Sequence, residues 1–330
     1  MDFLSFLDLA SNKVGGGVIA ANDDFFAPKE NLIVPAAPVW REGKYTERGK
    51  WMDGWETRRR RSPRQDEKFD WCIIRLGLPG QIKGVIVDTA FFRGNYPSHC
   101  SIEGCFTEGH PEPDDFIGDR TQWKEILPLS ELKGDTQNKF TIISDERLTH
   151  LRFKIYPDGG VARLRVHGIV QPDWEELRKR NSEIDLAAAE NGGSVPLASD
   201  MFFGHRQNLI MPGMARDMSD GWESQRRRGP GHDWCIVKLG TRGKISRIEV
   251  DTSHFKGNYP ERCSLEGGVA DTDLLDSIEW KPLLPMSKLQ AHTRHSFSKE
   301  LADVGEISHV RFNIFPDGGV SRLRMYSRIA

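Results

Sequence analysis

Carboxylates, arginines and a tryptophan recur together at two places in the sequence. Residues 53–61 read DGWETRRRR, and residues 220–228 read DGWESQRRR. A glutamate beside an aromatic ring in a partly dry pocket can have a pKa raised into the range of a general acid or base. A planar guanidinium can bind a carboxylate through two hydrogen bonds. The pattern therefore nominates Glu56 and Glu223 as acid–base residues, and it nominates the arginine runs as anion-binding residues, with Arg59, Arg60, Arg226 and Arg227 first among them.

Two further matching segments carry polar side chains in turns. Residues 87–97 (VDTAFFRGNYP) match residues 250–260 (VDTSHFKGNYP), and residues 155–165 (IYPDGGVARLR) match residues 314–324 (IFPDGGVSRLR). Asparagine supplies both a donor and an acceptor, and ligand contacts gather in the loops of β-sandwiches. These segments add the binding candidates Asn95, Tyr96, Asn258, Tyr259, Arg163 and Arg322.

Each of these groups also has a structural interpretation. A run of arginines is often a solvated face, and a glutamate can simply pair with neighbouring arginines to order a loop. Gly-Asn and Tyr-Pro form turns whatever they bind. The tryptophans of the DGWE segments are expected to be core anchors. The sequence leaves both interpretations open for each residue.

A difference between the two copies gives the sharpest catalytic candidate. His254 stands where the first copy has Phe91, and histidine titrates near neutral pH. In the other direction, His99 stands where the second copy has Arg262. We expect His254 to act as an acid or base, with a buried structural histidine as the alternative.

The repeats define the organisation of the chain. Four segments recur in the same order with a period of about 160 residues, which is the size of a domain rather than of a solenoid repeat. Apolar and basic residues alternate along residues 150–156, and long helical patterns are absent. The sequence predicts an all-β protein of two tandem jelly-roll sandwiches, residues 1–170 and 182–330. Residues 171–181 are predicted to be a helical linker, capped by Asp173 with Glu176.

Composition and charge exclude several classes of protein. Lysine plus arginine number 46 against 48 acidic residues, so no nucleic-acid partner is expected. No apolar stretch is long enough to cross a membrane and no signal peptide is evident, so a cytoplasmic location is expected. The five cysteines lack C-x-x-C spacing and should be reduced and buried. No phosphate loop, metal motif or organic cofactor is indicated, and dependence on a divalent metal stays open.

Taken together, the four duplicated motifs resemble those of the allantoicase family over nearly the whole chain. The resemblance implies jelly rolls similar to galactose-binding or discoidin modules, and hydrolysis of allantoate to ureidoglycolate and urea in allantoin degradation. It further implies that arginines hold the substrate carboxylate, that asparagines meet its ureido groups, and that the chain forms a homo-oligomer. The alternative is a tandem non-catalytic β-sandwich module that binds a small polar or carbohydrate ligand.

Overall fold

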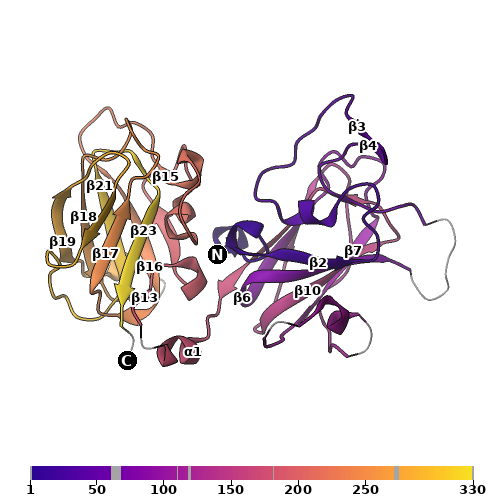
Figure 1. Cartoon of the computed structure of the whole chain (residues 1–330), viewed down its shortest axis with the longest axis horizontal. Helices are drawn as coiled ribbons and strands as arrows, with labels where there is room; N and C mark the ends of the chain where they lie inside the picture. Colours follow the sequence, from indigo (N-terminus) through magenta and orange to yellow (C-terminus); the bar gives the residue numbers. More distant parts are fainter. Residues whose placement is uncertain are drawn as a thin grey trace. The chain divides into compact units, whose positions relative to one another are not determined.

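The computed structural model describes residues 2–60, 68–109, 111–117, 120–180, 182–270 and 275–328. The chain divides into two compact units, Met1–Gln171 and Pro172–Ala330 (Figure 1). All strand pairs given for the described residues are antiparallel, which confirms the all-β prediction. The single α-helix among these residues, α1 (Trp174–Lys179), follows the first unit, and Asp173 accepts a hydrogen bond from the Glu176 amide at 2.9 Å as the capping pattern predicts.

In the first unit, the long strand β6 pairs with strands that all belong to one sheet. In the second unit, the corresponding pairings are divided between two sheets. The first half of β6 pairs with β10 and β2, and its second half pairs with β12 and β9. The strands are β1 (Leu7–Asp8), β2 (Gly17–Ala21), β3 (Tyr45–Thr46), β4 (Gly49–Lys50), β5 (Trp55–Glu56), β6 (Asp70–Asp88), β7 (His99–Cys105), β8 (Lys124–Glu131), β9 (Gln137–Thr141), β10 (Arg147–Tyr156), β11 (Gly160–Val161) and β12 (Arg163–Val170).

The second unit has separate strands, β16 and β17, where the first has β6. One sheet has the order β13-β23-β17-β20 and the other β14-β16-β21-β18-β19, while β15 pairs with β22. The strands are β13 (Ile184–Asp185), β14 (Ser194–Ala198), β15 (Trp222–Glu223), β16 (Asp233–Gly243), β17 (Arg247–Asp251), β18 (Arg262–Gly268), β19 (Lys281–Lys288), β20 (Arg294–Phe297), β21 (Ile307–Phe315), β22 (Gly319–Val320) and β23 (Arg322–Ser327). Short 3-10 helices connect the strands: η1 (Phe3–Ser5), η2 (Asn12–Val14), η3 (Lys29–Ile33), η4 (Pro113–Phe116), η5 (Ala189–Asn191), η6 (Arg206–Ile210), η7 (Met218–Asp220) and η8 (Leu275–Ser277).

The tryptophans of the DGWE segments anchor the cores. Trp55 and Trp222 are fully buried, and their rings lie 6.1 Å from those of Phe153 and Phe312. Each indole N–H donates a 2.8 Å hydrogen bond to a backbone carbonyl, because a buried indole needs an acceptor. These anchors fix β5 and β15, and with them the glutamates that follow.

The Pro-Asp-Gly-Gly turns bring separate motifs together. The amide of Gly319 donates to the Asn258 carbonyl at 2.8 Å, and the preceding Gly318 has a φ of 132°. A Cβ at Gly318 would lie 2.5 Å from the same carbonyl, so only glycine fits there. Asp317 accepts a hydrogen bond from the Arg227 amide at 2.9 Å. The turn therefore holds the asparagine loop and the arginine segment in fixed positions.

The Asp-Thr pairs have structural tasks. The hydroxyl of Thr252 donates to the Gln290 carbonyl at 2.6 Å, and Asp251 accepts a hydrogen bond from the Ser253 amide at 2.8 Å. Thr89 and Asp88 make the same contacts in the first unit. These bonds set the backbone of the residues that follow, which include His254.

The cysteines follow the prediction. All five are free and buried. Burial raises the pKa of the Cys100 and Cys263 thiols to about 12, so neither is a thiolate near neutral pH. Among the described residues, no helix is long and apolar enough to span a membrane.

The burial of Asp185 predicts that the stability of the second unit depends on pH. Burial raises the pKa of its carboxyl to about 6, even though the amides of Ala187 and Met325 donate to it and the Arg324 guanidinium is nearby. A carboxyl whose pKa rises on folding stabilises the fold at pH values below its unfolded pKa, and this stabilisation is lost as pH rises through the folded pKa. We expect wild type to lose about 2–3 kcal/mol relative to Asp185→Asn between pH 3 and pH 7. Chemical unfolding at several pH values measures this; parallel curves for the two proteins would contradict it.

Candidate active site

In each unit the structure joins a candidate acid to a candidate binding residue. The side-chain amide of Asn95 donates to Glu56 Oε1 at 2.7 Å, and that of Asn258 donates to Glu223 Oε1 at 2.5 Å. Burial raises the pKa of Glu56 against the opposing effect of Asn95. Strand pairing positions the two glutamates, since β5 pairs with β11 and β15 pairs with β22. Residues far apart in the sequence thus form one polar pair in each repeat.

In the second repeat this pair adjoins a hollow of about 460 Å³. The hollow combines two imidazoles, a cation, a carboxylate and an amide, which are the groups needed to bind a small polar anion and move a proton. Its lining residues are Asp217, Met218, His254, Lys256, Gly257, Asn258 and His292. Asn258 belongs both to this lining and to the pair with Glu223. We refer to this site as the hollow.

His254 is held by its backbone and by its ring. Its φ is 72°, and its amide donates to His292 Nδ1 at 2.7 Å. Its Nε2 lies 2.9 Å from the Ala215 carbonyl oxygen. The two imidazole rings are 5.7 Å apart between centroids, with an interplanar angle of 70°. His254 Nδ1 has no hydrogen-bond partner among the described residues, so it is available to a ligand.

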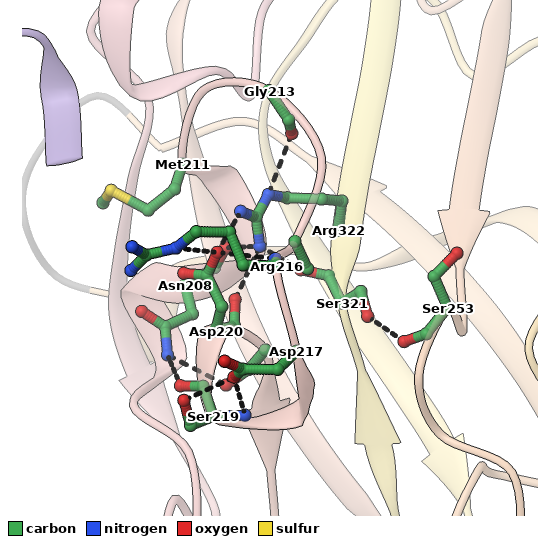
Figure 2. Close-up of polar contacts among 12 residues, drawn as sticks. Asn208, Met211, Gly213, Arg216, Asp217, Ser219, Asp220, Ser253, Ser321 and Arg322 are labelled. Carbon is green, nitrogen blue, oxygen red and sulfur yellow. Dashed lines mark hydrogen bonds and ion pairs between the residues drawn. The ribbon is translucent and has the colours of Figure 1, made fainter.

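A buried arginine holds the segment that supplies the Ala215 carbonyl. Arg322 donates from Nε to the Gly213 carbonyl at 3.1 Å and from Nη1 to the Asp220 carbonyl at 2.6 Å. Its Nη2 lies 3.1 Å from the Asp220 carboxylate. Figure 2 shows the guanidinium next to the chain that carries Gly213, Arg216 and Asp220. We call this arrangement the arginine clamp.

The first repeat has the same clamp. Arg163 is 2% exposed, and it donates to the Ala36 and Asp53 carbonyls and to the Asp53 carboxylate, the last at 2.9 Å. Both arginines were candidates for binding a substrate carboxylate. In each of them Nε, Nη1 and Nη2 all have a protein acceptor, so their observed task is to position a loop.

The remaining arginines fall into two groups. Arg60 and Arg227 each form an ion pair through Nη2 with a buried aspartate, Asp70 and Asp233 respectively. Arg59 and Arg226 are exposed and make no hydrogen bond or ion pair within the described part of the chain. Arg59 and Arg226 can therefore reach a ligand, whereas the next residues in the sequence, Arg60 and Arg227, are paired within the protein. Arg61 lies outside the described residues.

Known proteins match this chain over nearly its whole length. A family model for the allantoicase repeat matches residues 7–171 and 184–330. The chain belongs to the allantoicase family. It is 48% identical to a probable allantoicase of Stutzerimonas stutzeri (strain A1501), over 99% of this chain and 97% of that protein. It is 49% identical to a probable allantoicase of Pseudomonas aeruginosa (strain UCBPP-PA14), over 98% and 96%. The crystal structure of an allantoicase from Saccharomyces cerevisiae is 36% identical, with a TM-score of 0.81, and covers 97% of this chain and 92% of that one.

The two allantoicase repeats differ at the hollow. Where the second has His254 and His292, the first has Phe91 and Asp135. The backbone is the same, because Phe91 and Asp135 also have positive φ values, 69° and 51°, and Asp135 accepts the Phe91 amide at 2.8 Å. His99 lies elsewhere, at the start of β7, where its Nδ1 contacts the Ser98 hydroxyl at 3.0 Å. The first repeat therefore keeps the scaffold of the hollow without its imidazoles.

The tyrosines of the asparagine loops are half-buried. Tyr96 packs against the cluster of Met52, Phe92 and Ala162. The hydroxyls of Tyr96 and Tyr259 make no hydrogen bond to other described residues, so the predicted role in binding stays a prediction.

Sequence reasoning missed three residues that bring a charged or imidazole side chain to the hollow: Asp217, Lys256 and His292. A signal for His292 exists in the sequence, because residues 132–136 (LKGDT) align with residues 289–293 (LQAHT) and place it opposite Asp135. His292 also lies three positions before His295, a spacing that two metal ligands can have. His292 Nδ1 and His295 Nε2 each accept a backbone amide, and the described residues contain no group of three potential metal ligands.

A second recess of about 280 Å³ lies beside the clamp in the same unit. It is rich in charge, but its arginines face protein carboxylates: Arg324 lies 3.5 Å from Asp185 and Arg294 lies 3.8 Å from Asp251. The lining residues are Asp185, Glu190, Gly213, Met214, Glu249, Asp251, Arg294, Arg322, Arg324 and Tyr326. The hollow differs in offering a free imidazole nitrogen and a lysine without an ion pair among the described residues.

Proposed function

We propose that the hollow of the second repeat is the active site at which this allantoicase hydrolyses allantoate to ureidoglycolate and urea, in allantoin degradation. The observation that carries this assignment is the free Nδ1 of His254 beside Asn258 and Lys256. Allantoate has a carboxylate and two ureido groups on one tetrahedral carbon. The hollow provides a cation for the carboxylate and an amide for a ureido group.

His254 acts as the base and then as the acid. Water gives a proton to Nδ1 while its oxygen forms a bond to the substrate carbon. The bond from that carbon to the nitrogen of one ureido group breaks, and the proton on Nδ1 passes to this nitrogen. Urea leaves and the hydroxyl stays on ureidoglycolate, so atoms and charges balance. During the cycle Nε2 keeps its hydrogen bond to the Ala215 carbonyl, which stabilises the imidazolium.

Lys256 and Asn258 hold the substrate in this scheme. Lys256 is exposed at the hollow and binds the carboxylate as a point charge. Asn258 is oriented by Glu223, because a hydrogen bond from its amide to a carboxylate leaves its carbonyl oxygen free to accept from a ureido N–H. Arg226 is exposed three residues beyond Glu223 and remains a candidate second cation for the carboxylate.

Release of urea from allantoate by the purified chain tests the proposed function. We expect release by wild type and a fall in kcat/KM of about 10–100-fold for Glu223→Ala, because Asn258 loses the carboxylate that orients it. The matched variant Glu56→Ala removes the equivalent glutamate of the first repeat and should keep turnover near that of wild type. Absence of release by wild type, with or without added divalent metal, would overturn the proposal. Equal losses in the two variants would place both repeats in catalysis.

The proposal also includes the cellular location, the oligomeric state and the partners of the chain. We expect the chain to act in the cytoplasm as a homo-oligomer, without an organic cofactor and without a nucleic-acid partner. Its formal charge of -2 supports a small anionic substrate over a polyanion.

A further inference from the structure

We propose that His254 and His292 act together on the departing ureido group: His254 Nδ1 passes to it the proton taken from water, His292 Nε2–H donates a hydrogen bond to it, and the backbone fixes both roles. The inference rests on the proposed function and makes His292 a catalytic residue. It also predicts that the first repeat, with Phe91 and Asp135, does not carry the reaction.

The backbone decides which nitrogen of His292 carries the proton. Its Nδ1 lies 2.7 Å from the His254 amide nitrogen. A backbone N–H only donates, so Nδ1 must accept and cannot carry a proton. The neutral ring therefore has its proton on Nε2, and His292 presents a donor.

In His254 the free nitrogen is Nδ1, and it is an acceptor. Its Nε2 lies 2.9 Å from the Ala215 carbonyl oxygen, which only accepts. Nε2 must therefore carry the proton, and Nδ1 of the neutral ring has a free lone pair. Both rings carry their proton on Nε2, but the nitrogen left free is Nδ1 in His254 and Nε2 in His292.

This pair complements a ureido group. A ureido group is planar and has a nitrogen beside a C=O, so the nitrogen can take the proton from His254 Nδ1 while the C=O accepts a hydrogen bond from His292 Nε2–H. Both rings line the hollow, with centroids 5.7 Å apart. As the carbon–nitrogen bond breaks, negative charge grows on the departing group, and the His292 Nε2–H stabilises it. His292 does not transfer this proton, because Nδ1 is occupied and cannot take another.

The pair is held in place before a ligand binds. His254 and His292 have φ values of 72° and 49°, and Thr252 bonds to the carbonyls of Gln290 and Thr293, on either side of His292. The charged side chains that line the hollow with them are Asp217 and Lys256. Asp217 is turned to its own loop, where it accepts from the Ser219 amide and hydroxyl at 2.9 and 2.6 Å.

The first repeat supplies matched variants for a test. Asp135 accepts the Phe91 amide at 2.8 Å from the position of His292, so His292→Asp keeps the backbone bond and removes the donor. His292→Asn keeps an acceptor for the backbone and adds an amide donor. Both residues tolerate a positive φ, so neither change strains the loop. Asp135→Asn is the control in the first repeat.

Steady-state kinetics of urea release separate these variants. We expect His292→Asp to lower kcat by about 100-fold, the effect of removing one such donor, with KM changed less. His292→Asn should stay within about 10-fold of wild type, and Asp135→Asn should equal it. Equal activities of His292→Asp and His292→Asn would overturn the inference, whereas an inactive wild type would overturn the proposed function instead.

A spectroscopic measurement tests the tautomers without relying on activity. Nitrogen-15 NMR of the wild-type chain at a pH where both rings are neutral should show protonated Nε2 and unprotonated Nδ1 for His254 and His292. A protonated Nδ1 in either ring would contradict the assignment.

Discussion

Replacing Arg322 by methionine should lower the free energy of unfolding of the second unit by about 3–5 kcal/mol and abolish most urea release. The side chain is 3% exposed, and its removal takes away the guanidinium 3.1 Å from the buried Asp220 carboxylate, while the exposed Arg216 lies farther off, at 3.9 Å. The Asp220 carbonyl also loses its Arg322 donor and the Gly213 carbonyl keeps only that from Arg324, so the segment that carries Ala215 is held less firmly against His254. Chemical unfolding gives the stability change, and urea release gives the activity.

The first repeat provides the control for this change. Arg163→Met breaks the equivalent clamp on Asp53, so a stability loss of similar size is expected in the first unit. Urea release per folded molecule should nevertheless stay near that of wild type, because the hollow lies in the second unit. If Arg163→Met and Arg322→Met reduced turnover equally, the arginine clamp would have no particular connection with the hollow.

Changing His254 to phenylalanine should reduce kcat by about 10²–10⁴-fold, because the base of the reaction is lost. The change is structurally mild, since the first repeat has Phe91 at this position with nearly the same φ, 69° against 72°. Thermal unfolding should therefore change little while urea release falls.

Two controls belong with that variant. Phe91→His should leave turnover unchanged, because Asp135 stands where the second repeat has the donor His292. A His254→Phe protein that is folded and as active as wild type would remove His254 from the mechanism.

Much of the fold could be predicted from the sequence because the chain contains it twice. The recurrence of DGWE, GNYP and PDGG in the same order implied two equal sandwiches, and period-two alternation implied strands. The unbroken length of β6 could not be predicted in this way. Residues 70–88 form one strand, whereas the second repeat interrupts the equivalent segment between β16 and β17.

The candidate site was only partly visible in the sequence. The sequence indicated Glu223, Asn258 and His254 separately, and the fold places His254 and Asn258 in the lining of one hollow, with Glu223 bonded to Asn258. It could not separate Arg226 from Arg322, because the difference depends on which carbonyls and carboxylates surround each guanidinium after folding. His292 was missed because its importance comes from an amide 38 positions away in the sequence.

The location of the bound substrate tests the central claim most directly. A crystal structure of the His254→Asn variant with allantoate uses a side chain that tolerates a positive φ and leaves room for the ligand. We predict allantoate in the hollow, with its carboxylate on Lys256 and one ureido group on His292 and Asn258. Allantoate bound instead between Arg294 and Arg324, or beside Glu56 and Asn95, with the hollow empty, would contradict the account.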